Sequence, residues 1–263
     1  MLNRSDWYDI ARDTNWTPRY VAEEELFPPA MSDPYGISWE EWETFDEPYK
    51  VSYREYVRVQ REKDADVYSV KAALSRSKFY ENADPSWIGI LKLHYGVIPL
   101  TEYAACQLQA MSIRFGKAPG WRNTATFGLL DELRHTQLQL YFPHELVSKD
   151  RQFDWAHQAH HTKNWLIMGG RHCFDDVMMT RDAVANAVLT AFSFETAFTN
   201  LQMIGLASDA AKVGDWTFTN LITSIQSDEA RHAQIGMPLI EILLRNRPKA
   251  EIQQLIDIGF WRL

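Results

Sequence analysis

Two pentapeptides of closely similar sequence constrain the fold of this chain more than any other feature. They read Asp131-Glu-Leu-Arg-His135 and Asp228-Glu-Ala-Arg-His232. Each contains Glu-x-x-His, and residues three positions apart on an α-helix project from the same face, so both side chains can reach one metal ion. A single Glu-x-x-His arises by chance and usually marks a solvated helix face. Two copies with matching Asp and Arg residues predict a metal site built from two helices.

A glutamate in an apolar stretch precedes each pentapeptide. Glu102 lies 30 residues before Glu132, and Glu195 lies 34 residues before Glu229, which suits antiparallel helices joined by a loop. Burying an ionised carboxylate among apolar side chains is unfavourable unless a cation neutralises it. Four carboxylates and two histidines form the ligand set of ferritin-like di-iron or di-manganese proteins. The predicted ligands are Glu102, Glu132, His135, Glu195, Glu229 and His232.

The charged residues of the pentapeptides predict the surroundings of this site. Asp131 and Asp228 would each accept a hydrogen bond from the ligating histidine of the other helix, which would fix its tautomer and orientation. Arg134 and Arg231 would pair with these acids. Ordinary surface ion pairs are the alternative for all four residues.

Helical patterns run from Tyr53 onward without convincing strand alternation and predict an all-α fold. One helix has clear limits, because Asp84-Pro85 supplies an N-cap and a first-turn proline, and residues 116–120 contain the Gly and Pro that end it. Pro99 and Pro238 lie inside helical patterns and are expected to kink them. Further helices are expected up to about residue 142, at 155–178 and at 182–207. Gly214-Asp215 then opens a helix that carries residues 227–236, and a last helical segment lies beyond Pro248.

No linker of low complexity divides this helical region. We therefore expect one ferritin-like four-helix bundle with a di-metal centre and extra flanking helices over residues 51–263. Residues 1–50 are rich in Trp, Pro and acidic residues and lack sustained periodicity. An extended N-terminal arm with short helical turns is expected there.

Composition argues against several other classes of protein. A net charge of −8 without a basic run argues against nucleic-acid binding, which needs a surplus of Lys and Arg on one face. Two cysteines outside any CxxC pair favour a reducing cytoplasm, and no apolar core of a signal peptide is present. Residues 183–206 have the length of a membrane span, but Glu195 would be costly in a bilayer. A buried helix carrying a charged ligand, without membrane contact, is therefore expected.

Further segments resemble the hydroxylase alpha subunit of bacterial soluble di-iron multicomponent monooxygenases, with the toluene and alkene (isoprene) subgroup nearest. The resemblance covers essentially the whole chain and keeps register through all six ligands. Family alpha subunits continue for a second half of comparable size, so the chain is expected to be an N-terminal half, truncated at its C-terminal end. The segments are Trp7-Tyr-Asp9, Asn15-Trp-Thr-Pro18, Asp46-Glu-Pro-Tyr49, Gln60-Arg-Glu-Lys63, Lys117-Ala-Pro-Gly120, Phe194-Glu-Thr196 and Ser224-Ile-Gln226.

The resemblance implies an NADH-dependent oxygenase reaction. Two iron ions would activate O₂ and insert one oxygen atom into an aromatic hydrocarbon or an alkene, while the other atom leaves as water. Electrons would come from NADH through a separate reductase, often with a Rieske-type ferredoxin. A small effector protein would regulate the hydroxylase, which contains further beta and gamma subunits.

The resemblance also implies roles for single residues. Thr199, one turn after Glu195, matches a threonine associated with oxygen activation or proton delivery; a hydroxyl bonded to the helix backbone is the alternative. Gln226 matches a residue linked to effector binding and access. Thr101 and Met203 depart from the usual residues and change the shape of the cavity, so the preferred hydrocarbon is not carried over. The positions that match cavity-lining residues are Ile98, Thr101, Ala105, Phe174, Phe194 and Met203.

Other functions share part of this pattern. A desaturase or a ribonucleotide reductase small subunit uses the same ligand plan, but the resembling segments outside the ligands argue against both. An iron-storage protein, or a fragment that binds metal without catalysis, belongs to a different class. Ferritin-type chains are shorter and lack the aromatic N-terminal arm.

Overall fold

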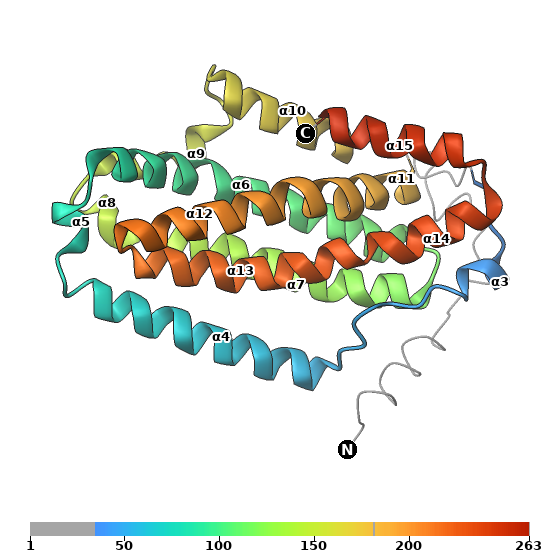
Figure 1. Ribbon diagram of the computed structural model, residues 1–263, viewed down its shortest axis with the longest axis horizontal. Coiled ribbons are helices and arrows are strands. Elements are labelled where there is room, and N and C mark those ends of the chain that lie inside the picture. The colour runs from blue at the N-terminus through green and yellow to red at the C-terminus, as the bar shows by residue number, and fades with distance from the viewer. Residues whose placement is uncertain (1–34, 181, 263) are drawn as a thin grey trace, which may run out of the picture.

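Four long helical segments run side by side through the centre of the molecule (Figure 1). In the computed structural model, which describes residues 35–180 and 182–262, α6 (Pro85–Phe115) pairs with α7 (Pro119–Tyr141). A continuous helical segment over residues 183–213 forms the second pair with α13 (Trp216–Gln234). The described residues contain helices and no strand. The predicted all-α helical bundle is therefore confirmed.

Local sequence explains where these helices begin and end. The Asp84 side chain accepts a hydrogen bond from the backbone N–H of Ser86 at 2.7 Å, and Pro85 occupies the first turn of α6. Gly116 follows the last residue of α6, as predicted. Gly214, with φ +84°, ends the helix before α13 in a left-handed conformation that glycine adopts without steric cost.

The apolar segment that carries Glu195 is not a uniform α-helix. It consists of α11 (Ala183–Ala187), the π-helical segment η3 (Val188–Thr199) and α12 (Asn200–Val213). The predicted end near residue 207 is too early, because no glycine or proline lies between that residue and Gly214. π-Helical turns are rare and occur frequently at functional sites. Here the wider turns of η3 include the buried Glu195.

One other prediction about helix continuity is wrong. The single helix expected over residues 155–178 divides into α9 (Ala156–Ala159) and α10 (Trp165–Met178). Asn164 starts α10 anew, because its side chain accepts a hydrogen bond from the Leu166 N–H at 3.0 Å. Pro238 was expected to disturb a helical pattern, and a turn at Ile235 does separate α13 from α14 (Gly236–Asn246), in whose first turn Pro238 lies.

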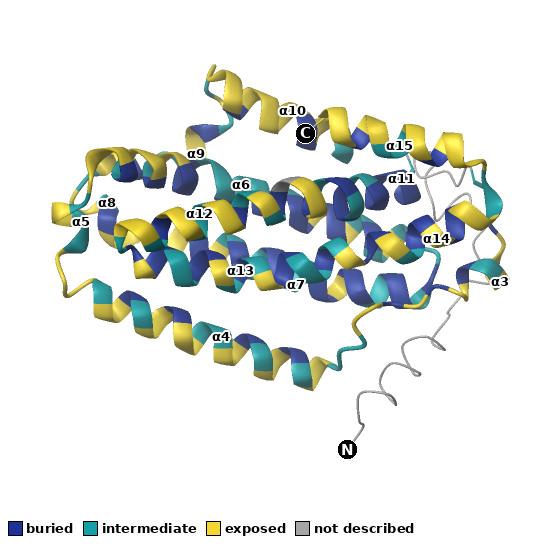
Figure 2. Ribbon diagram, viewed as in Figure 1, coloured by how far each residue is buried: buried dark blue, intermediate teal, exposed yellow. Residues whose placement is uncertain are grey.

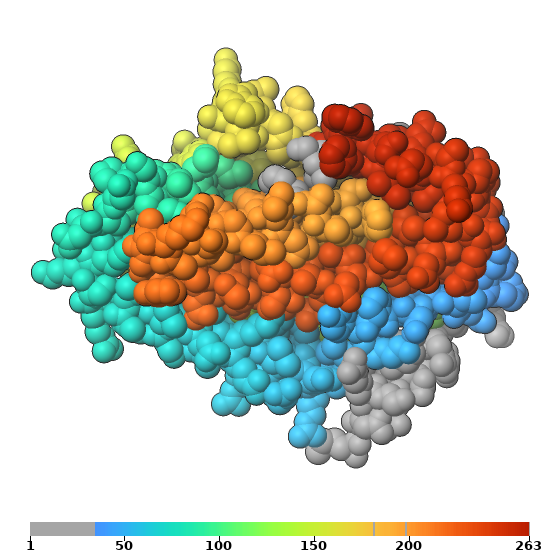
Figure 3. Space-filling view, viewed as in Figure 1, coloured from blue at the N-terminus to red at the C-terminus, as the bar shows by residue number. Residues whose placement is uncertain are grey.

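Further helices flank the bundle, as predicted. α4 (Tyr53–Leu74) runs along the outside of α13, and α15 (Lys249–Arg262) packs on η3. α10 contacts α6 and stands out from the body in the space-filling view (Figure 3). No described helix has the length and apolar character needed to cross a membrane. The short connecting turns are α3 (Trp39–Trp42), α5 (Phe79–Asn82), α8 (His144–Val147) and the 3₁₀ turn η2 (Arg151–Phe153).

Buried apolar side chains form two large clusters in the bundle, and Figure 2 shows buried residues along the length of its helical segments. In one cluster the rings of Trp42 and Trp121 lie 5.8 Å apart, and in the other aromatic side chains surround Phe218. Trp42 belongs to the predicted N-terminal arm, so this part of the arm packs on the body. Residues 1–34 lie outside the described residues, and the division into an arm and a domain stays a prediction.

Candidate metal centre

Six acidic and imidazole side chains from the four bundle segments converge between the two apolar clusters. They form two overlapping groups, and within each group the possible ligand atoms lie within 4.8 Å of one another. Glu132 and Glu229 belong to both groups. The first group adds Glu102 from α6 and His135 from α7, and the second adds Glu195 from η3 and His232 from α13.

All six side chains are buried, with at most 6% of any residue exposed. Both carboxylate oxygens of Glu132 and Oε2 of Glu195 make no hydrogen bond of good geometry. Leaving a buried polar atom unsatisfied costs about 1–3 kcal/mol, and more if the group is charged. A cation between these oxygens would satisfy them, so the donor set fits a metal site.

Each histidine directs one ring nitrogen into the cluster and the other away from it. Nδ1 of His135 lies 2.9 Å from Oε1 of Glu229, and Nδ1 of His232 lies 3.1 Å from Oε2 of the same residue. Nε2 of His135 lies 3.4 Å from Asp228, whereas Nε2 of His232 lies 3.1 Å from Asp131. Donation of Nε2–H to the aspartate leaves the Nδ1 lone pair available for a metal.

Arginines hold the two aspartates in turn. Arg231 pairs with Asp131, and Nη1 of Arg134 lies 3.2 Å from Oδ2 of Asp228. Both aspartates are fully buried, so they are not members of ordinary surface ion pairs. The structure thus has the crossed arrangement expected from the sequence, in which the aspartate of each pentapeptide contacts the histidine of the other. The role of these contacts toward a metal stays a prediction.

Helix α4 contributes residues that the sequence analysis missed as site residues. Nε2 of Gln60 donates to Asp131 at 2.7 Å and to Asp228 at 2.9 Å, so one amide joins the two halves of the site. Tyr56 donates its hydroxyl to Asp131 at 2.8 Å, and Nζ of Lys63 lies 2.6 Å from Asp228. The spacing of these three residues places them on one face of α4. Polar residues at this spacing were the signal in the sequence that could have identified the three residues as part of the site.

The charge balance of the cluster depends on protons when no metal is bound. Burial raises the pKa of Glu102 to about 8 and raises the pKa of Glu195 well above its usual value, with the neighbouring Glu229 adding to the second shift. Burial alone would lower the pKa of His135, but the surrounding carboxylates, Glu229 first, raise it well above its usual value. Protons therefore partly replace cations in the metal-free site, and metal binding displaces them.

The two residues given catalytic roles by resemblance lie close to this centre. Thr199 is buried at the last position of η3, four residues after Glu195. Gln226 is half-buried on α13, and its side-chain amide donates to Oδ1 of Asn200 at 3.0 Å. Nδ2 of Asn200 donates to the backbone carbonyl of Glu195 at 2.6 Å. Gln226 is therefore linked to the backbone of a candidate ligand, and both catalytic roles stay predictions.

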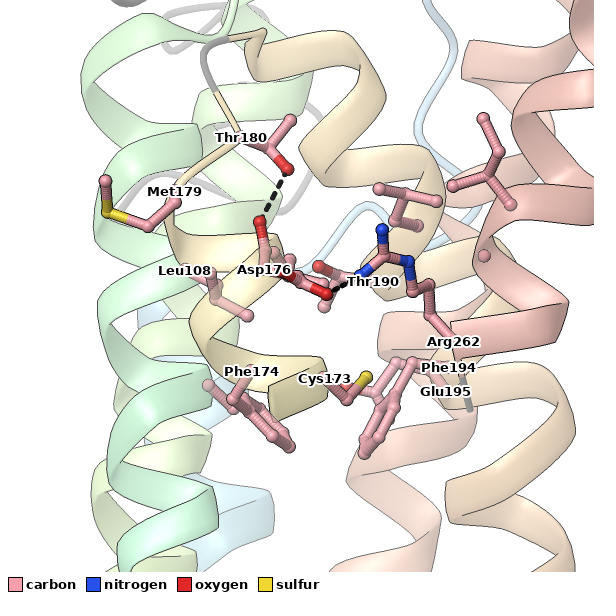
Figure 4. Close-up of a pocket in the computed structure, with 15 residues that line it drawn as sticks. Leu108, Cys173, Phe174, Asp176, Met179, Thr180, Thr190, Phe194, Glu195 and Arg262 are labelled. Atoms are coloured by element: carbon pink, nitrogen blue, oxygen red, sulfur yellow. Dashed lines mark hydrogen bonds and ion pairs between the residues drawn. The ribbon is translucent and has the colours of Figure 1, made fainter. Parts of the chain in front are cut away.

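A cavity of about 340 Å³ reaches the cluster at Glu195. Three of the predicted pocket residues, Ala105, Phe174 and Phe194, line it, and Figure 4 shows the two phenylalanines pointing toward it. The ion pair between Asp176 and Arg262 joins α10 to α15 across the same cavity (Figure 4). The cavity is therefore bounded by bundle and flanking helices together.

A second cavity, of about 330 Å³, lies between α6, α10 and α12. Ile98 and Thr101 line it, and Phe174 and Phe194 line it as well as the first cavity. The two phenylalanine rings meet nearly edge to face at 5.1 Å, so they stand between the two cavities. Met203 lines neither cavity, because it packs in the apolar cluster around Phe218.

Two buried polar residues beside the cluster were also missed. Nε2 of Gln139 donates to Oε1 of Glu102. Gln139 lies one turn after His135, so its position on the ligand face of α7 could have identified it. His94 lies on α6, eight residues before Glu102, and is buried in the wall of the second cavity.

The protein is a four-helix bundle, and its interior contains two overlapping groups of carboxylate and histidine side chains. These features define the class of helical-bundle proteins that can hold a pair of metal ions. A model of the methane/phenol/alkene hydroxylase family matches residues 16–247. The chain belongs to this family. The family assignment also decides against the desaturase, ribonucleotide reductase and iron-storage alternatives that the residues alone left open.

Individual relatives agree with the assignment. The chain is 44% identical, over its whole length, to the alpha subunit of the oxygenase component of the alkene monooxygenase system of Xanthobacter autotrophicus (strain Py2), and covers 52% of that protein. It is 31% identical, over 99% of its length, to the oxygenase component of phenol 2-monooxygenase of Pseudomonas sp. (strain CF600), of which it covers 50%. The chain thus spans about half the length of these curated relatives.

Solved structures share the fold. Phenol hydroxylase from Pseudomonas sp. OX1 matches the whole chain with a TM-score of 0.85 and 29% identity, and 53% of that chain is covered. A chain of toluene 4-monooxygenase matches 97% of this chain with a TM-score of 0.82, and 86% of that chain is covered. Its identity is 16%, so this second match shows the fold alone.

Proposed function

We propose that this chain carries the di-iron centre of the oxygenase component of a multicomponent monooxygenase. The reaction is insertion of one oxygen atom of O₂ into an aromatic hydrocarbon or an alkene. The observation that supports the proposal best is the pair of overlapping buried ligand groups that share Glu132 and Glu229. Membership of a hydroxylase family supports oxygenation over other uses of such a site.

The charge and the donor types of the site suit two divalent iron ions. Four carboxylates carry four negative charges, which two divalent cations neutralise while both histidines remain neutral. Carboxylate and imidazole donors without thiolates suit iron of this kind. Bound iron supplies the activation of O₂. The residues that hold it in this proposal are Glu102, Glu132, His135, Glu195, Glu229 and His232.

Neighbouring side chains orient the ligands and control access. Asp131 and Asp228 fix the histidine rings, so that each Nδ1 faces the metal position. Phe174 and Phe194 provide an apolar wall beside the first cavity, which favours a hydrocarbon over water. Thr199, four residues after Glu195 in η3, would deliver protons through its hydroxyl. Gln226 would adjust η3 through its contact with Asn200 when the effector binds.

We place the chain in an assembly with other proteins. The relatives above are components of multicomponent systems, and electrons would reach this site from NADH through a reductase and a Rieske-type ferredoxin. A small effector protein and further beta and gamma subunits complete the proposed hydroxylase. The free thiols of Cys106 and Cys173 agree with a cytoplasmic location.

Anaerobic titration with Fe²⁺ tests the metal site. The wild-type chain should bind about two iron ions, the number that this ligand set holds. Glu195→Ala and His232→Ala should each remove iron from the second group, whereas His172→Ala, an exposed histidine on α10, should leave the iron content unchanged. Unchanged iron content in both ligand variants would contradict the assignment.

Product analysis tests the reaction itself. The chain is combined with reductase, ferredoxin, effector protein, further hydroxylase subunits and NADH, and is offered toluene, phenol and small alkenes. Formation of hydroxylated aromatics or epoxides supports the proposal. NADH consumption that is independent of substrate, in protein that contains two irons, would point to a metal-binding chain without oxygenase activity.

A further inference from the structure

Two buried glycines on flanking helices lie against the π-helical segment that carries Glu195. Gly236 begins α14 and Gly259 lies in α15. Both helices pack on η3, which lies between the labels of α11 and α12 in Figure 1. A Cβ on Gly236 would lie within 2.9 Å of three atoms of Phe192, and one on Gly259 would lie 2.5 Å from Oγ of Ser193. Ordinary Cβ contacts are 3.4 Å or longer, so a larger residue at either position requires a shift.

The contact at Gly236 involves the backbone of η3. Two of the three atoms that a Cβ would meet are N and Cα of Phe192, which cannot turn away as the end of a side chain can. Because protein interiors are closely packed, an added methyl group would move the segment itself, by about 0.5 Å to reach an ordinary contact. Binding sites lose their productive geometry when ligands move by about this distance. A shift of this size is therefore large enough to disturb a metal site nearby.

The same contact joins the two segments that supply ligands to the second group. Phe192 lies three residues before Glu195 in η3, and Gly236 lies four residues after His232 of α13. Residues at these spacings are about one helical turn apart. The ligands that belong to the first group alone come from α6 and α7 instead. The spacing between Gly236 and Phe192 therefore acts on the second group.

We propose that Gly236 and Gly259 are positioning residues that set the place of η3 against α13, and with it the geometry of the second metal position. The inference rests on the proposed metal centre. π-Helical turns are rare, so the turns around Glu195 depend on the helices packed against them. The absence of a side chain at Gly236 lets α14 approach the backbone of η3, and Gly259 lets α15 approach the same segment.

Co²⁺ added to the full metal-free chain provides the probe, because the visible absorption of bound Co²⁺ depends on its ligands and their geometry. The wild type should bind about two ions. Gly236→Ala should weaken one of the two binding steps about tenfold to a hundredfold, as loss of an outer contact of a ligand does, and change its absorption. The other step should stay unchanged. Gly259→Ala should act in the same direction by less, because Oγ of Ser193 and Cδ2 of Leu189 can turn away.

Two ligand variants show which metal position is affected. His135→Ala removes a ligand of the first group alone, so Co²⁺ then binds in the second group. In this background, Gly236→Ala should weaken the binding that remains. His232→Ala leaves the first group intact instead, and there Gly236→Ala should have no effect.

Two controls separate positioning from a general loss of stability. Gly205→Ala is the matched substitution on α12, where a Cβ meets nothing within 4 Å. Asp84→Ala removes the N-cap of α6, about five turns before Glu102, and lowers stability without touching η3. Urea unfolding measures the stability of every variant. Both controls should keep the two Co²⁺ affinities of the wild type.

The results that overturn the proposal are distinct. Two unchanged affinities in folded Gly236→Ala would overturn it, and so would an equal loss at both positions, because a merely structural role would not distinguish them. If the wild type does not bind two Co²⁺ ions, the proposed function and this inference fail together. If the wild type binds two and Gly236→Ala behaves like Gly205→Ala, only this inference fails.

A measurement without any change at the glycines keeps the test decisive if Gly236→Ala does not fold. In His135→Ala, where only the second group is complete, Co²⁺ should slow amide hydrogen exchange in residues 188–199 and 235–240 together. Slower exchange in residues 188–199 without any change in residues 235–240 would overturn the proposal.

Discussion

Gln60 offers the sharpest test of how the surroundings of the metal centre are held. Its side-chain amide nitrogen donates to Asp131 at 2.7 Å and to Asp228 at 2.9 Å, and these aspartates contact the two candidate histidine ligands. Gln60→Met keeps a side chain of similar length and removes both donors. The variant therefore probes the hydrogen bonds with little change in packing volume.

The expected loss of stability in Gln60→Met depends on the hydrogen-bond donors that the two aspartates keep. A hydrogen bond to a charged group contributes about 1.5–3 kcal/mol. Asp131 keeps Tyr56 and Arg231, and Asp228 keeps Lys63 at 2.6 Å, so neither carboxylate is left without a donor. We therefore expect the free energy of unfolding to fall by about 2 kcal/mol, close to the value of one such bond rather than two.

Metal affinity should fall together with stability. Removing an outer contact of a ligating histidine typically weakens metal binding about tenfold to a hundredfold, and Gln60 acts on both histidines through the aspartates. Urea unfolding of the metal-free protein measures the first effect, and competition with a chelator for Fe²⁺ measures the second.

An exposed residue of the same helix supplies the control. Glu62 pairs with Arg58 on the outer face of α4, and both side chains are about 60% exposed. Such surface pairs contribute little, so Glu62→Gln should change stability by less than about 0.5 kcal/mol and leave iron affinity unchanged. If Gln60→Met and Glu62→Gln unfold at the same urea concentration and bind iron equally, the reasoning about the shared amide is refuted.

Two further predictions concern how other segments pack on the bundle. Burial raises the pKa of Glu47 from 4.5 to about 7, so the folded chain keeps a proton that the unfolded chain loses; this contribution to stability is complete below about pH 4.5 and is lost as the pH rises through 7. Glu47→Gln should remove about 3 kcal/mol of that pH dependence, and thermal unfolding between pH 4 and 8 checks it: an unchanged slope would disprove the assignment. A Cβ on Gly96 would meet the Trp155 ring at 2.0 Å, so Gly96→Ala should destabilise the chain by about 1–3 kcal/mol. Gly89→Ala on the same helix meets nothing within 4 Å and should stabilise it by up to about 1 kcal/mol, and urea unfolding in which both variants shift in the same direction would contradict this account.

The sequence by itself determined the features that depend on local spacing. Glu-x-x-His within each pentapeptide places both side chains on one helix face whatever surrounds the helix. The capping signals Asp84-Pro85 and Gly214 likewise act on adjacent backbone groups, and the structure has helix ends at both. The bundle, its flanking helices and the candidate ligands could therefore be predicted before any contact between helices was known.

Only the tertiary structure decided which distant groups meet. Gln60 contacts acids 71 and 168 residues away, and no periodicity along the chain encodes such a meeting. The π-helical turns around Glu195 and the core position of Met203 likewise result from packing between helices. Long-range hydrogen bonds and cavities depend on how the faces of different helices pack against one another. The spacing of side chains on one helix, in contrast, depends only on residues a few positions apart.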